Sequence, residues 1–463
     1  MPQLKCFTAY DVRGRVPEEL NPEIAARIGL AFCCQIKARK IVIGRDVRLS
    51  SPELAETLCD VLTKTGIDVL DIGLCGTEEV YFAVFSGEAE GIDGGIMVTA
   101  SHNPAEWNGM KFVCQGAKPM SSDSGLLEVA ARAADAEWCR AALLKNPALV
   151  GRNQKMPNKH RYISHLLSYI AVPALKPLKI VVNAGNGCAG PVLDLLAQRL
   201  PITFVRLNWQ PDGTFPNGVP NPLLPENREE TAQAVREHNA DLGVAWDGDC
   251  DRCFLFDENG RFIEGYYIVG LLAAALLTRH PGGVILHDPR LIWNTQEMVR
   301  EAGGTPMMVK TGHAFIKEAM RRENALYGGE MSAHHYFRDF GCCDSGMLPW
   351  LLVCQLLSAQ RTTLSALVDE RMRAFPVSGE INSTVADPDA VIRSVEARHS
   401  DGEKDYTDGL SVSYPRWRFN LRKSNTEPVL RLNVETRADE ALLQTKTQEL
   451  LDLIRGQNVP PAV

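Results

Sequence analysis

Short apolar runs alternate with helical patterns along much of this chain, and this alternation constrains the fold more than any other feature of the sequence. Residues 40–46 (KIVIGRD), 67–72 (IDVLDI) and 95–99 (GIMVT) have the composition of buried strands. Between the first two runs, apolar side chains recur at helical spacing after Ser51, the expected N-cap, and Pro52 at the first helical position. Strands that alternate with helices in this way predict an α/β fold.

The length of 463 residues predicts about three domains, or four smaller ones. A polar stretch at 145–159 without a sustained period indicates a first boundary. A second strand and helix pattern starts with residues 179–183 (KIVVN), and a third follows the turn at 258–260 and includes a strand at 284–287. We therefore expect three α/β units in succession.

The pattern changes near Phe375 to strand, helix, two strands and a last helix over residues 438–454. This order predicts a smaller α+β domain at the end of the chain. We place the four domains at residues 1–150, 151–257, 258–373 and 374–463.

The 49 basic and 57 acidic residues give a net charge of −8, which argues against a nucleic-acid-binding protein that relies on overall basicity. Any phosphate must then be bound by local positive charge.

The sequence shows neither an apolar window long enough to span a membrane nor an export signal, so we expect a cytoplasmic protein without membrane association. The 13 cysteines, including the Cys250–Cys253 pair, are interpreted as reduced core thiols.

Residues 247–252 (DGDCDR) form the sharpest motif, because they lie between two apolar runs that predict buried strands. Asp247, Asp249 and Asp251 would repel one another unless a cation lay among them, and Mg²⁺ is the expected occupant. An EF-hand is excluded, since Arg252 stands where that loop needs glycine. The alternative is a solvated acidic turn.

The loop at 99–104 (TASHNP) follows a predicted strand, the position at which α/β proteins expose active residues. Ser101 could be a nucleophile or phosphoryl carrier, with His102 and Lys111 as charge partners. The alternative is a polar turn that merely closes the strand.

Residues 185–190 (GNGCAG) match the G-x-G-x-x-G pattern of dinucleotide sites, after a strand and before a helix. The next predicted strand ends in Asn208, where a dinucleotide site needs a carboxylate for the ribose hydroxyls. We therefore interpret these glycines as a tight strand-to-helix turn.

Three further loops carry polar groups. Residues 327–335 (YGGEMSAHH) place Glu330 and Ser332 two positions apart, a pair suited to vicinal sugar hydroxyls or to an acidic surface turn. His313 follows another predicted strand and could transfer protons, although a lone histidine is more often structural. Residues 422–428 (RKSNTEP) combine an arginine, hydroxyls and an amide in one turn, which predicts an anion cradle or a plain hairpin turn.

Together and in this order, these loops and residues 10–14 (YDVRG) resemble the motifs of the α-D-phosphohexomutase family, and most closely those of its bacterial phosphomannomutases. The resemblance runs almost from end to end. It implies three related α/β domains with mixed sheets and a smaller C-terminal α+β domain, all arranged around a central cleft.

The resemblance also implies a role for each matching residue. Ser101 would carry the phosphoryl group, and its phosphate would complete a Mg²⁺ site with Asp247, Asp249 and Asp251. Charge neutralisation or proton transfer is implied for Arg13, His102, Lys111, Arg252 and His313. Substrate binding is implied for Tyr10, Arg290, Glu330, Ser332, Arg422, Ser424, Asn425 and Thr426, with Glu330 and Ser332 on the sugar 3- and 4-hydroxyls.

The implied reaction interconverts mannose 1-phosphate and mannose 6-phosphate through a phosphoserine enzyme and a bound hexose 1,6-bisphosphate, and supplies GDP-mannose synthesis. The alternatives are a phosphoglucomutase or dual-specificity enzyme and, further away, a sugar phosphatase. Ala333, where relatives often have glycine, and Arg290, where they often have lysine, leave the sugar specificity open. We expect Mg²⁺ and the bisphosphate as cofactors, a small hexose phosphate as the only partner, and a monomer or weak dimer.

Overall fold

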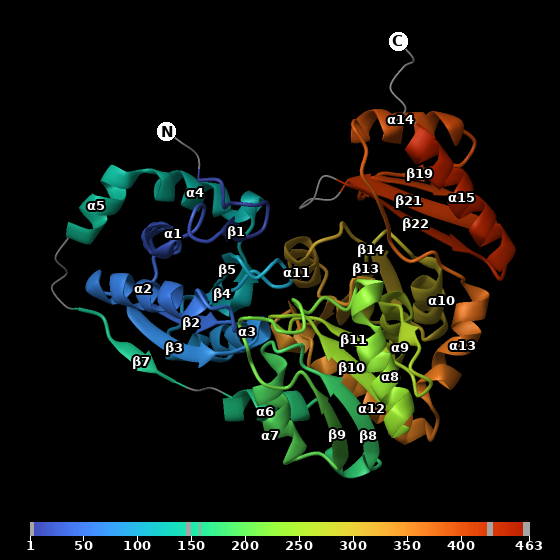
Figure 1. Cartoon of the computed structure of the whole chain (residues 1–463), viewed down its shortest axis with the longest axis horizontal. Helices are drawn as coiled ribbons and strands as arrows, with labels where there is room; N and C mark the ends of the chain where they lie inside the picture. Colours follow the sequence, from blue (N-terminus) through green and yellow to red (C-terminus); the bar gives the residue numbers. More distant parts are fainter. Residues whose placement is uncertain (1–3, 145–149, 157–158, 424–428, 457–463) are drawn as a thin grey trace. The chain divides into compact units, whose positions relative to one another are not determined.

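The computed structural model of the chain describes residues 4–144, 150–156, 159–423 and 429–456. It divides into two compact units, Met1–Phe262 with His334–Arg361 and Ile263–Ala333 with Thr362–Val463. Figure 1 shows the order of helices and strands within them. Among the described residues no single helix is both long and apolar enough to cross a membrane, and the consecutive helices α12 (Leu348–Gln360) and α13 (Leu364–Ala374) meet that test only when taken together.

The first sheet has the strand order β1-β5-β4-β2-β3-β7, with β6 beside β5. It is mixed, because β2 runs parallel to β3 and β4 whereas β5 runs antiparallel to β1 and β4. Helices lie on both faces of the sheet (Figure 1). Its strands are β1 (Val12–Arg15), β2 (Lys40–Arg45), β3 (Asp68–Leu74), β4 (Gly94–Val98), β5 (Trp107–Cys114), β6 (Lys118–Pro119) and β7 (Asn153–Lys155), and its helices are α1 (Pro22–Gln35), α2 (Ser51–Lys64), α3 (Thr77–Ser86), α4 (Leu126–Ala134) and α5 (Ala136–Leu144).

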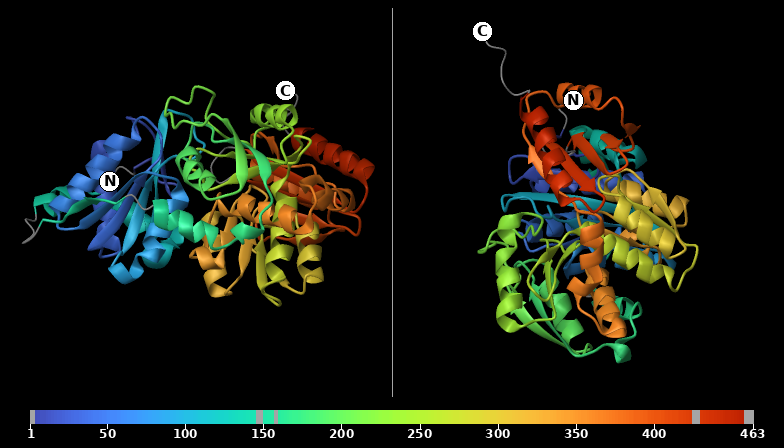
Figure 2. Two further views of the ribbon diagram at one scale, coloured as in Figure 1. Left: turned by 90° about the horizontal axis from the view of Figure 1, so that it is seen from below. Right: turned by 90° about the vertical axis from the view of Figure 1, so that its right-hand side faces the viewer.

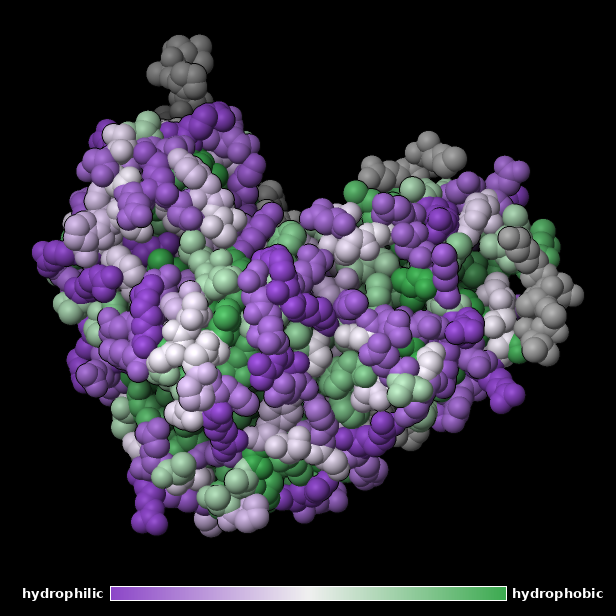
Figure 3. All heavy atoms as spheres, turned by 180° about the vertical axis from the view of Figure 1, so that it is seen from behind, coloured by the Kyte–Doolittle hydropathy of each residue, from purple (hydrophilic) through white to green (hydrophobic). Residues whose placement is uncertain are grey.

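The core under α1 and α2 follows from the spacing of their apolar residues. Ile28 and Phe32 in α1 and Leu58 and Leu62 in α2 recur every four positions, so each pair lies on one helix face and is buried in the same cluster as Ile41 of β2. On the face of the molecule shown in Figure 3, hydrophilic residues cover much of the surface, and hydrophobic residues lie among them in small groups. The apolar stripes are therefore turned inward, as the sequence pattern predicts.

The second sheet has the order β12-β11-β10-β8-β9. β8 pairs in parallel with β9 on one side and β10 on the other, and β10 turns back into the antiparallel β11. Trp246 and Cys253 face each other in that pair, so residues 247–252 form the connecting loop. The elements are α6 (Lys159–Leu167), β8 (Leu178–Asn183), α7 (Ala189–Ala197), β9 (Ile202–Leu207), α8 (Glu229–His238), β10 (Leu242–Trp246), β11 (Cys253–Phe256) and β12 (Phe262–Ile263).

The first unit also contains a segment from much later in the chain. β16 (His335–Phe337) and β17 (Cys343–Asp344) form an antiparallel pair, and α12 (Leu348–Gln360) follows them. Trp246 donates a hydrogen bond of 2.9 Å to the carbonyl oxygen of Gly346, which fixes this segment beside the end of β10. Residues distant in sequence thereby reach the loop at 247–252.

The second unit contains an α/β part and a C-terminal sheet. β13 pairs in parallel with β14 and β15, and the C-terminal sheet is antiparallel with the order β18-β22-β21-β20-β19. Helices α14 and α15 pack against that last sheet (Figure 2). The elements are α9 (Gly265–Leu277), β13 (Val284–His287), α10 (Trp293–Glu301), β14 (Thr305–Met308), α11 (His313–Arg322), β15 (Tyr327–Gly329), α13 (Leu364–Ala374), β18 (Ile381–Ser383), α14 (Pro388–Arg398), β19 (Glu403–Asp405), β20 (Leu410–Ser413), β21 (Trp417–Lys423), β22 (Leu430–Thr436) and α15 (Glu440–Gly456).

Some local elements differ from what the sequence pattern predicts. The stretch at 145–159, predicted as a boundary, contains the strand β7, and β12 continues the second sheet after residue 257. The C-terminal domain has β19 and β20 in addition to the predicted strands. β7 and β19 are short and polar, so they lack the apolar signal by which strands are found. β12 and β20 contain apolar residues but span only 2 and 4 residues. The N-cap of α2 is Ser50, because the helix begins at Ser51, whose hydroxyl donates to Asp46 at 2.5 Å.

Candidate active site

The loop between β10 and β11 buries three carboxylates. Asp247, Asp249 and Asp251 are 0%, 0% and 2% exposed, so the alternative of a solvated acidic turn is wrong. One oxygen from each lies within 4.8 Å of the others. Cys250 between them has a φ of 61°, a left-handed conformation that costs a non-glycine residue about 1–2 kcal/mol and that folds the loop tightly enough to gather the three side chains.

Two cations offset the charge of these carboxylates. Lys111 Nζ lies 2.7 Å from Asp249 Oδ2 and 2.5 Å from Asp251 Oδ2. Arg252 donates to Asp247 Oδ2 from Nε at 3.0 Å and from Nη2 at 2.7 Å. Burial lowers the pKa of Lys111, but the two aspartates outweigh it and hold that pKa above its usual value, so the side chain is charged.

The carboxylate group has spare capacity for a metal ion. The Oδ1 atoms of Asp249 and Asp251 are buried and accept no hydrogen bond from the described residues. Burial raises the pKa of Asp247 despite the opposing effect of Arg252, and the charges of Asp251 and Asp249 raise it further. Buried carboxylate oxygens with free lone pairs are the ligands that Mg²⁺ takes, so the residues fit the predicted ion.

Ser101 lies beside this group, at the start of the loop between β4 and β5. Its Oγ is 3.0 Å from Asp247 Oδ2 and 3.1 Å from His102 Nδ1. Its φ of 51° is left-handed, the kind of backbone strain that clusters at functional positions. Ser101 is only 3% exposed, which rules out a plain surface turn.

His102 is a neutral hydrogen-bond acceptor in this arrangement. Arg252 Nη2 lies 2.6 Å from His102 Nδ1, and a guanidinium can only donate. The proton of the neutral ring is therefore on Nε2. Burial, followed by the charges of Arg252 and Arg13, holds the pKa of His102 well below its usual range.

Arg48 holds the Ser101 loop in place through the backbone of that loop. Its guanidinium donates to four carbonyl oxygens of the loop, those of Ser101, Asn103, Pro104 and Trp107, at 2.6–2.8 Å. The side chain is 0% exposed and pairs with Asp46 at 3.2 Å. Nothing in the sequence pattern distinguishes Arg48 from other arginines, so it was not predicted.

Tyr10 lies before β1, and Arg13 is the second residue of that strand. Arg13 Nε lies 3.0 Å from Asp11 Oδ2, and Nη1 donates to the side chain of Asn103 and to the carbonyl oxygen of Ala100 at 3.4 Å. The structure thus places Arg13 against the Ser101 loop. Tyr10 lies half-buried in the turn before β1.

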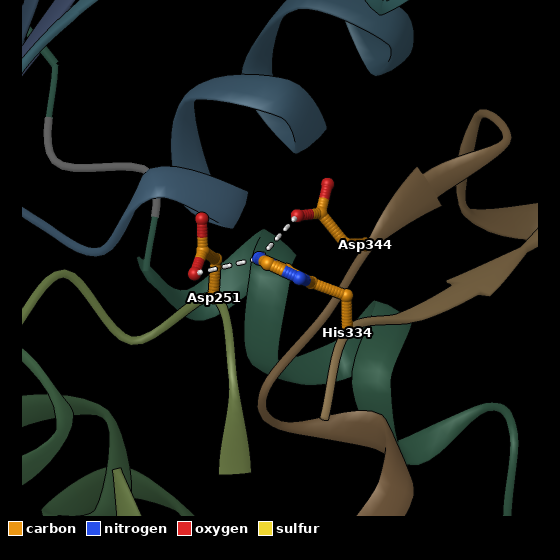
Figure 4. A group of neighbouring side chains, drawn as sticks. All are labelled: Asp251, His334 and Asp344. Carbon is orange, nitrogen blue, oxygen red and sulfur yellow. Dashed lines mark ion pairs between the residues drawn. The ribbon is translucent and has the colours of Figure 1, made fainter. Parts of the chain in front are cut away.

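A histidine between two carboxylates completes the site in the first unit. His334 Nε2 lies 3.7 Å from Asp251 Oδ1 and 4.0 Å from Asp344 Oδ2 (Figure 4). The three atoms are close enough to share a metal ion, although Asp251 then belongs to both groups. Neither His334 nor Asp344 was predicted; the only signal was the position of His334 at the end of the 327–335 loop.

The second unit contains a separate polar cluster around Arg290. Its Nη2 lies 2.7 Å from Asp288 Oδ2, 3.2 Å from Ser332 Oγ and 3.6 Å from Glu330 Oε1. Glu330 Oε1 also accepts from the backbone N–H of Gly312 at 3.0 Å, directly before His313 in α11. The predicted sugar residues Glu330 and Ser332 therefore share one arginine.

Glu380 joins this cluster to the predicted anion cradle. Its carboxylate lies 3.4 Å from Arg290, 3.2 Å from Arg422 and 3.1 Å from Arg431. Burial raises the pKa of Glu380, but the three arginines outweigh it and hold the pKa below its usual value. Glu380 and Arg431 were not predicted. The predicted residues Ser424, Asn425 and Thr426 lie outside the described residues.

The glycines at 185–190 fit the structural interpretation. A Cβ at Gly187 would lie 2.7 Å from the carbonyl oxygen of Gly248, and one at Gly190 would lie 2.2 Å from that of Trp209. Gly185 has a φ of 57°. Each position therefore needs glycine for packing or backbone conformation.

The comparisons with known proteins agree along the whole chain. Residues 4–137, 160–260 and 264–375 match the alpha/beta/alpha domains I, II and III of the phosphoglucomutase/phosphomannomutase family, and residues 380–452 match its C-terminal domain. The chain belongs to this family. The prediction of three α/β domains followed by a smaller C-terminal domain is thereby confirmed, whereas the exact boundaries and the central cleft stay predictions.

Relatives of this phosphohexomutase include bacterial enzymes of similar length. The chain is 57% identical to the phosphohexose mutases of Xanthomonas campestris and 57% identical to the phosphomannomutase of Salmonella montevideo, each over 98% of this chain and 100% of the relative. A solved structure of a phosphoglucomutase/phosphomannomutase family protein from Burkholderia thailandensis is 32% identical and superposes with a TM-score of 0.86, over 100% of both chains. The chain is therefore an isomerase, an intramolecular phosphotransferase, as predicted.

Proposed function

We propose that this phosphohexomutase interconverts mannose 1-phosphate and mannose 6-phosphate, with Ser101 as the phosphoryl carrier, and that it supplies GDP-mannose synthesis. The observation that carries the mechanism is the position of Ser101 Oγ, which lies 3.0 Å from Asp247 Oδ2. The buried loop that contains Asp247 also contains Arg252, and Lys111 contacts it through Asp249. The preference for mannose rests on the relatives from Salmonella montevideo and Escherichia coli, which are named phosphomannomutases.

The cations around Ser101 suit phosphoryl transfer, which depends on positioning and on charge near the equatorial oxygens. Arg252 Nη2 reaches both Asp247 and His102, so it borders the space in front of Ser101 Oγ. Arg13 contacts the same loop through Asn103. These two guanidinium groups would neutralise the phosphoryl group during its transfer.

Proton movements follow from the contacts of Ser101 and Lys111. Asp247 Oδ2 accepts the hydrogen bond of the Ser101 hydroxyl, so it lies where that proton leaves and returns. Lys111 is held in its charged form by Asp249 and Asp251 and can donate a proton to the sugar oxygen that leaves when the phosphoryl group passes to Ser101. His313 is a further candidate for proton transfer.

Mg²⁺ would be held by Asp247, Asp249 and Asp251, with an oxygen of phosphorylated Ser101. When bound, the ion supplies positive charge that offsets the developing charge on the phosphoryl oxygens. A fold relative, the N-acetylphosphoglucosamine mutase of Aspergillus fumigatus, has been solved in complex with GlcNAc-6P and magnesium (15% identity, TM-score 0.60, 98% of this chain and 96% of that one).

The second unit would bind the rest of the substrate. Glu330 and Ser332 would contact the sugar 3- and 4-hydroxyls, and Arg290 fixes both of them. Arg422, with Ser424, Asn425 and Thr426, would bind the phosphate that does not react. Arg431 pairs with the same Glu380 as Arg422 and would add positive charge beside it. A bound hexose 1,6-bisphosphate must then reorient so that either phosphate can face Ser101.

The test is ³¹P NMR of the purified protein with Mg²⁺, a trace of hexose 1,6-bisphosphate, and either mannose 1-phosphate or glucose 1-phosphate. We expect conversion to the 6-phosphates, with a higher kcat/KM for the mannose substrate. Equal or higher kcat/KM for glucose 1-phosphate would replace the proposal by a dual-specificity enzyme or phosphoglucomutase. Release of mainly inorganic phosphate would indicate a sugar phosphatase.

A further inference from the structure

A polar cavity of about 300 Å³ opens at the carboxyl ends of β8, β9 and β10 in the first unit. Its lining includes Asn183 and Trp246, the last residues of β8 and β10, and Asn208, directly after β9. In this sheet β8 lies between β9 and β10, so the chain passes first to one side of β8 and then to the other. Open α/β sheets bind ligands at such a switch point.

The amide groups of this cavity are held in place by one another. Asn208 Nδ2 donates to Glu230 Oε2 at 2.7 Å, and Asn183 Nδ2 donates to the same oxygen at 3.2 Å. Asn217 Nδ2 donates to Asn208 Oδ1 at 2.7 Å. Asn208 itself has a left-handed φ of 46°, as does Asn186 nearby at 56°. The polar wall is therefore rigid before any ligand arrives, which lowers the entropy cost of binding.

The charge of the lining selects against phosphorylated ligands. Among the described residues, none that lines the cavity is basic, and Glu226 and Glu230 are both acidic. Apolar surface comes from Val219, Pro220 and the ring of Trp246. A sugar ring carries hydroxyl groups around its edge and C–H groups on its faces. The amides and carboxylates of the lining suit the hydroxyl groups, and the apolar surfaces suit the C–H faces. We propose that this cavity binds a neutral sugar or polyol without a phosphate group, at a site separate from the reaction centre.

The experiment is saturation-transfer difference NMR on the full chain with D-mannose and myo-inositol as probes. We expect a saturable signal from the unmodified protein. Val219→Trp places a large ring in the cavity from a half-exposed position and should abolish the signal. Asn217→Ala should raise the dissociation constant of the probe at least about fivefold. Asn153→Ala, an exposed asparagine in β7, is the matched control and should leave the signal unchanged.

The inference is wrong if no saturable signal is found, or if Val219→Trp and Asn217→Ala both retain it while circular dichroism shows them folded. It is also wrong if mannose 1-phosphate displaces the probe at the same concentration at which it saturates the enzyme. The proposed function is tested separately, because Ser101→Ala should lose turnover and keep the mannose signal. Loss of mutase activity on every hexose phosphate would overturn that function and leave this site standing.

Discussion

Lys111 Nζ lies 2.7 Å from Asp249 Oδ2, although the two residues are 138 positions apart and come from different sheets. Lys111 is part of β5, and Asp249 lies in the loop after β10. The ion pair therefore joins β5, the strand that follows the Ser101 loop, to the loop that would bind the metal ion. Because Lys111 also pairs with Asp251, one ammonium group offsets two buried carboxylates.

Lys111→Met should destabilise the protein strongly in the absence of Mg²⁺. It removes the partner of two buried carboxylates, and breaking a buried pair in this way costs about 3–5 kcal/mol. Urea unfolding with and without Mg²⁺ measures the effect, and Mg²⁺ should restore part of the loss. Arg161→Met is the control, because its pair with Glu90 is exposed and is worth about 0–1 kcal/mol. Equal stability losses in the two variants would contradict this account of the loop.

Ser101→Gly should be more stable than Ser101→Ala, although both lack the hydroxyl. The φ of 51° costs an alanine about 1–2 kcal/mol, and the freedom of glycine in the unfolded chain returns about 0.4–1 kcal/mol. We expect a net difference of about 1 kcal/mol in the free energy of unfolding. At Ser122, which lies in a short helical turn, the same pair of substitutions should have the opposite order. A more stable alanine at position 101 would show that the loop relaxes out of the left-handed conformation.

Arg48→Lys should lower kcat by about 10²-fold, because an ammonium group cannot reach four carbonyl oxygens at once and the Ser101 loop would shift. KM for the hexose phosphate should change little, since Arg48 is buried against the backbone of the loop and would not contact the substrate. Steady-state kinetics provides the measurement. Arg15→Lys is the control, because Arg15 also lies near Trp107 but is exposed. A kcat within about threefold of the unmodified enzyme would show that Arg48 does not position Ser101.

Glu78 should make stability fall as the pH rises. Burial raises the pKa of Glu78 from 4.5 to about 8, even though Ser345 and Tyr162 hydrogen-bond to it. Between these two values the folded protein keeps a proton that the unfolded chain loses, so stability decreases through this window by up to ~1.4 kcal/mol per pH unit. Above pH 8 the loss is complete.

The measurement for Glu78 is urea unfolding at pH 6 and pH 8. The neutral variant Glu78→Gln should remove most of the difference between the two conditions, whereas Glu88→Gln at an exposed position should not. If Glu78→Gln kept the full pH dependence, another group would be responsible for it.

The sequence predicts most of the sheets because their strands are apolar, and it predicts the aspartate loop because three carboxylates between two buried strands need a cation. Ser101 could be selected because its loop follows a strand. The short polar strands β7 and β19 could not be found, since backbone pairing alone leaves no mark in the side-chain pattern. The residue type at position 101 also gives no warning of its left-handed backbone.

The sequence predicts the cations of the site better than their partners. Arg13, Arg290 and Arg422 were predicted as site residues, but the carboxylates that hold them were not. Asp11, Asp288 and Glu380 become visible as partners only in three dimensions. The same is true of Arg48, His334 and Asp344, which contact the site from separate parts of the chain. Sequence motifs therefore identify groups that carry the chemistry, and folding adds the groups that position them.

The central claim is that Ser101 carries the phosphoryl group, and intact-mass spectrometry after incubation with Mg²⁺ and mannose 1,6-bisphosphate tests it most directly. We expect the protein to gain the mass of one phosphoryl group, peptide mapping to place it on Ser101, and mannose 6-phosphate to remove it again. The Ser101→Ala variant should gain no mass and should lose turnover. A variant that still gained the phosphoryl group and turned over at the normal rate would contradict the assignment of Ser101.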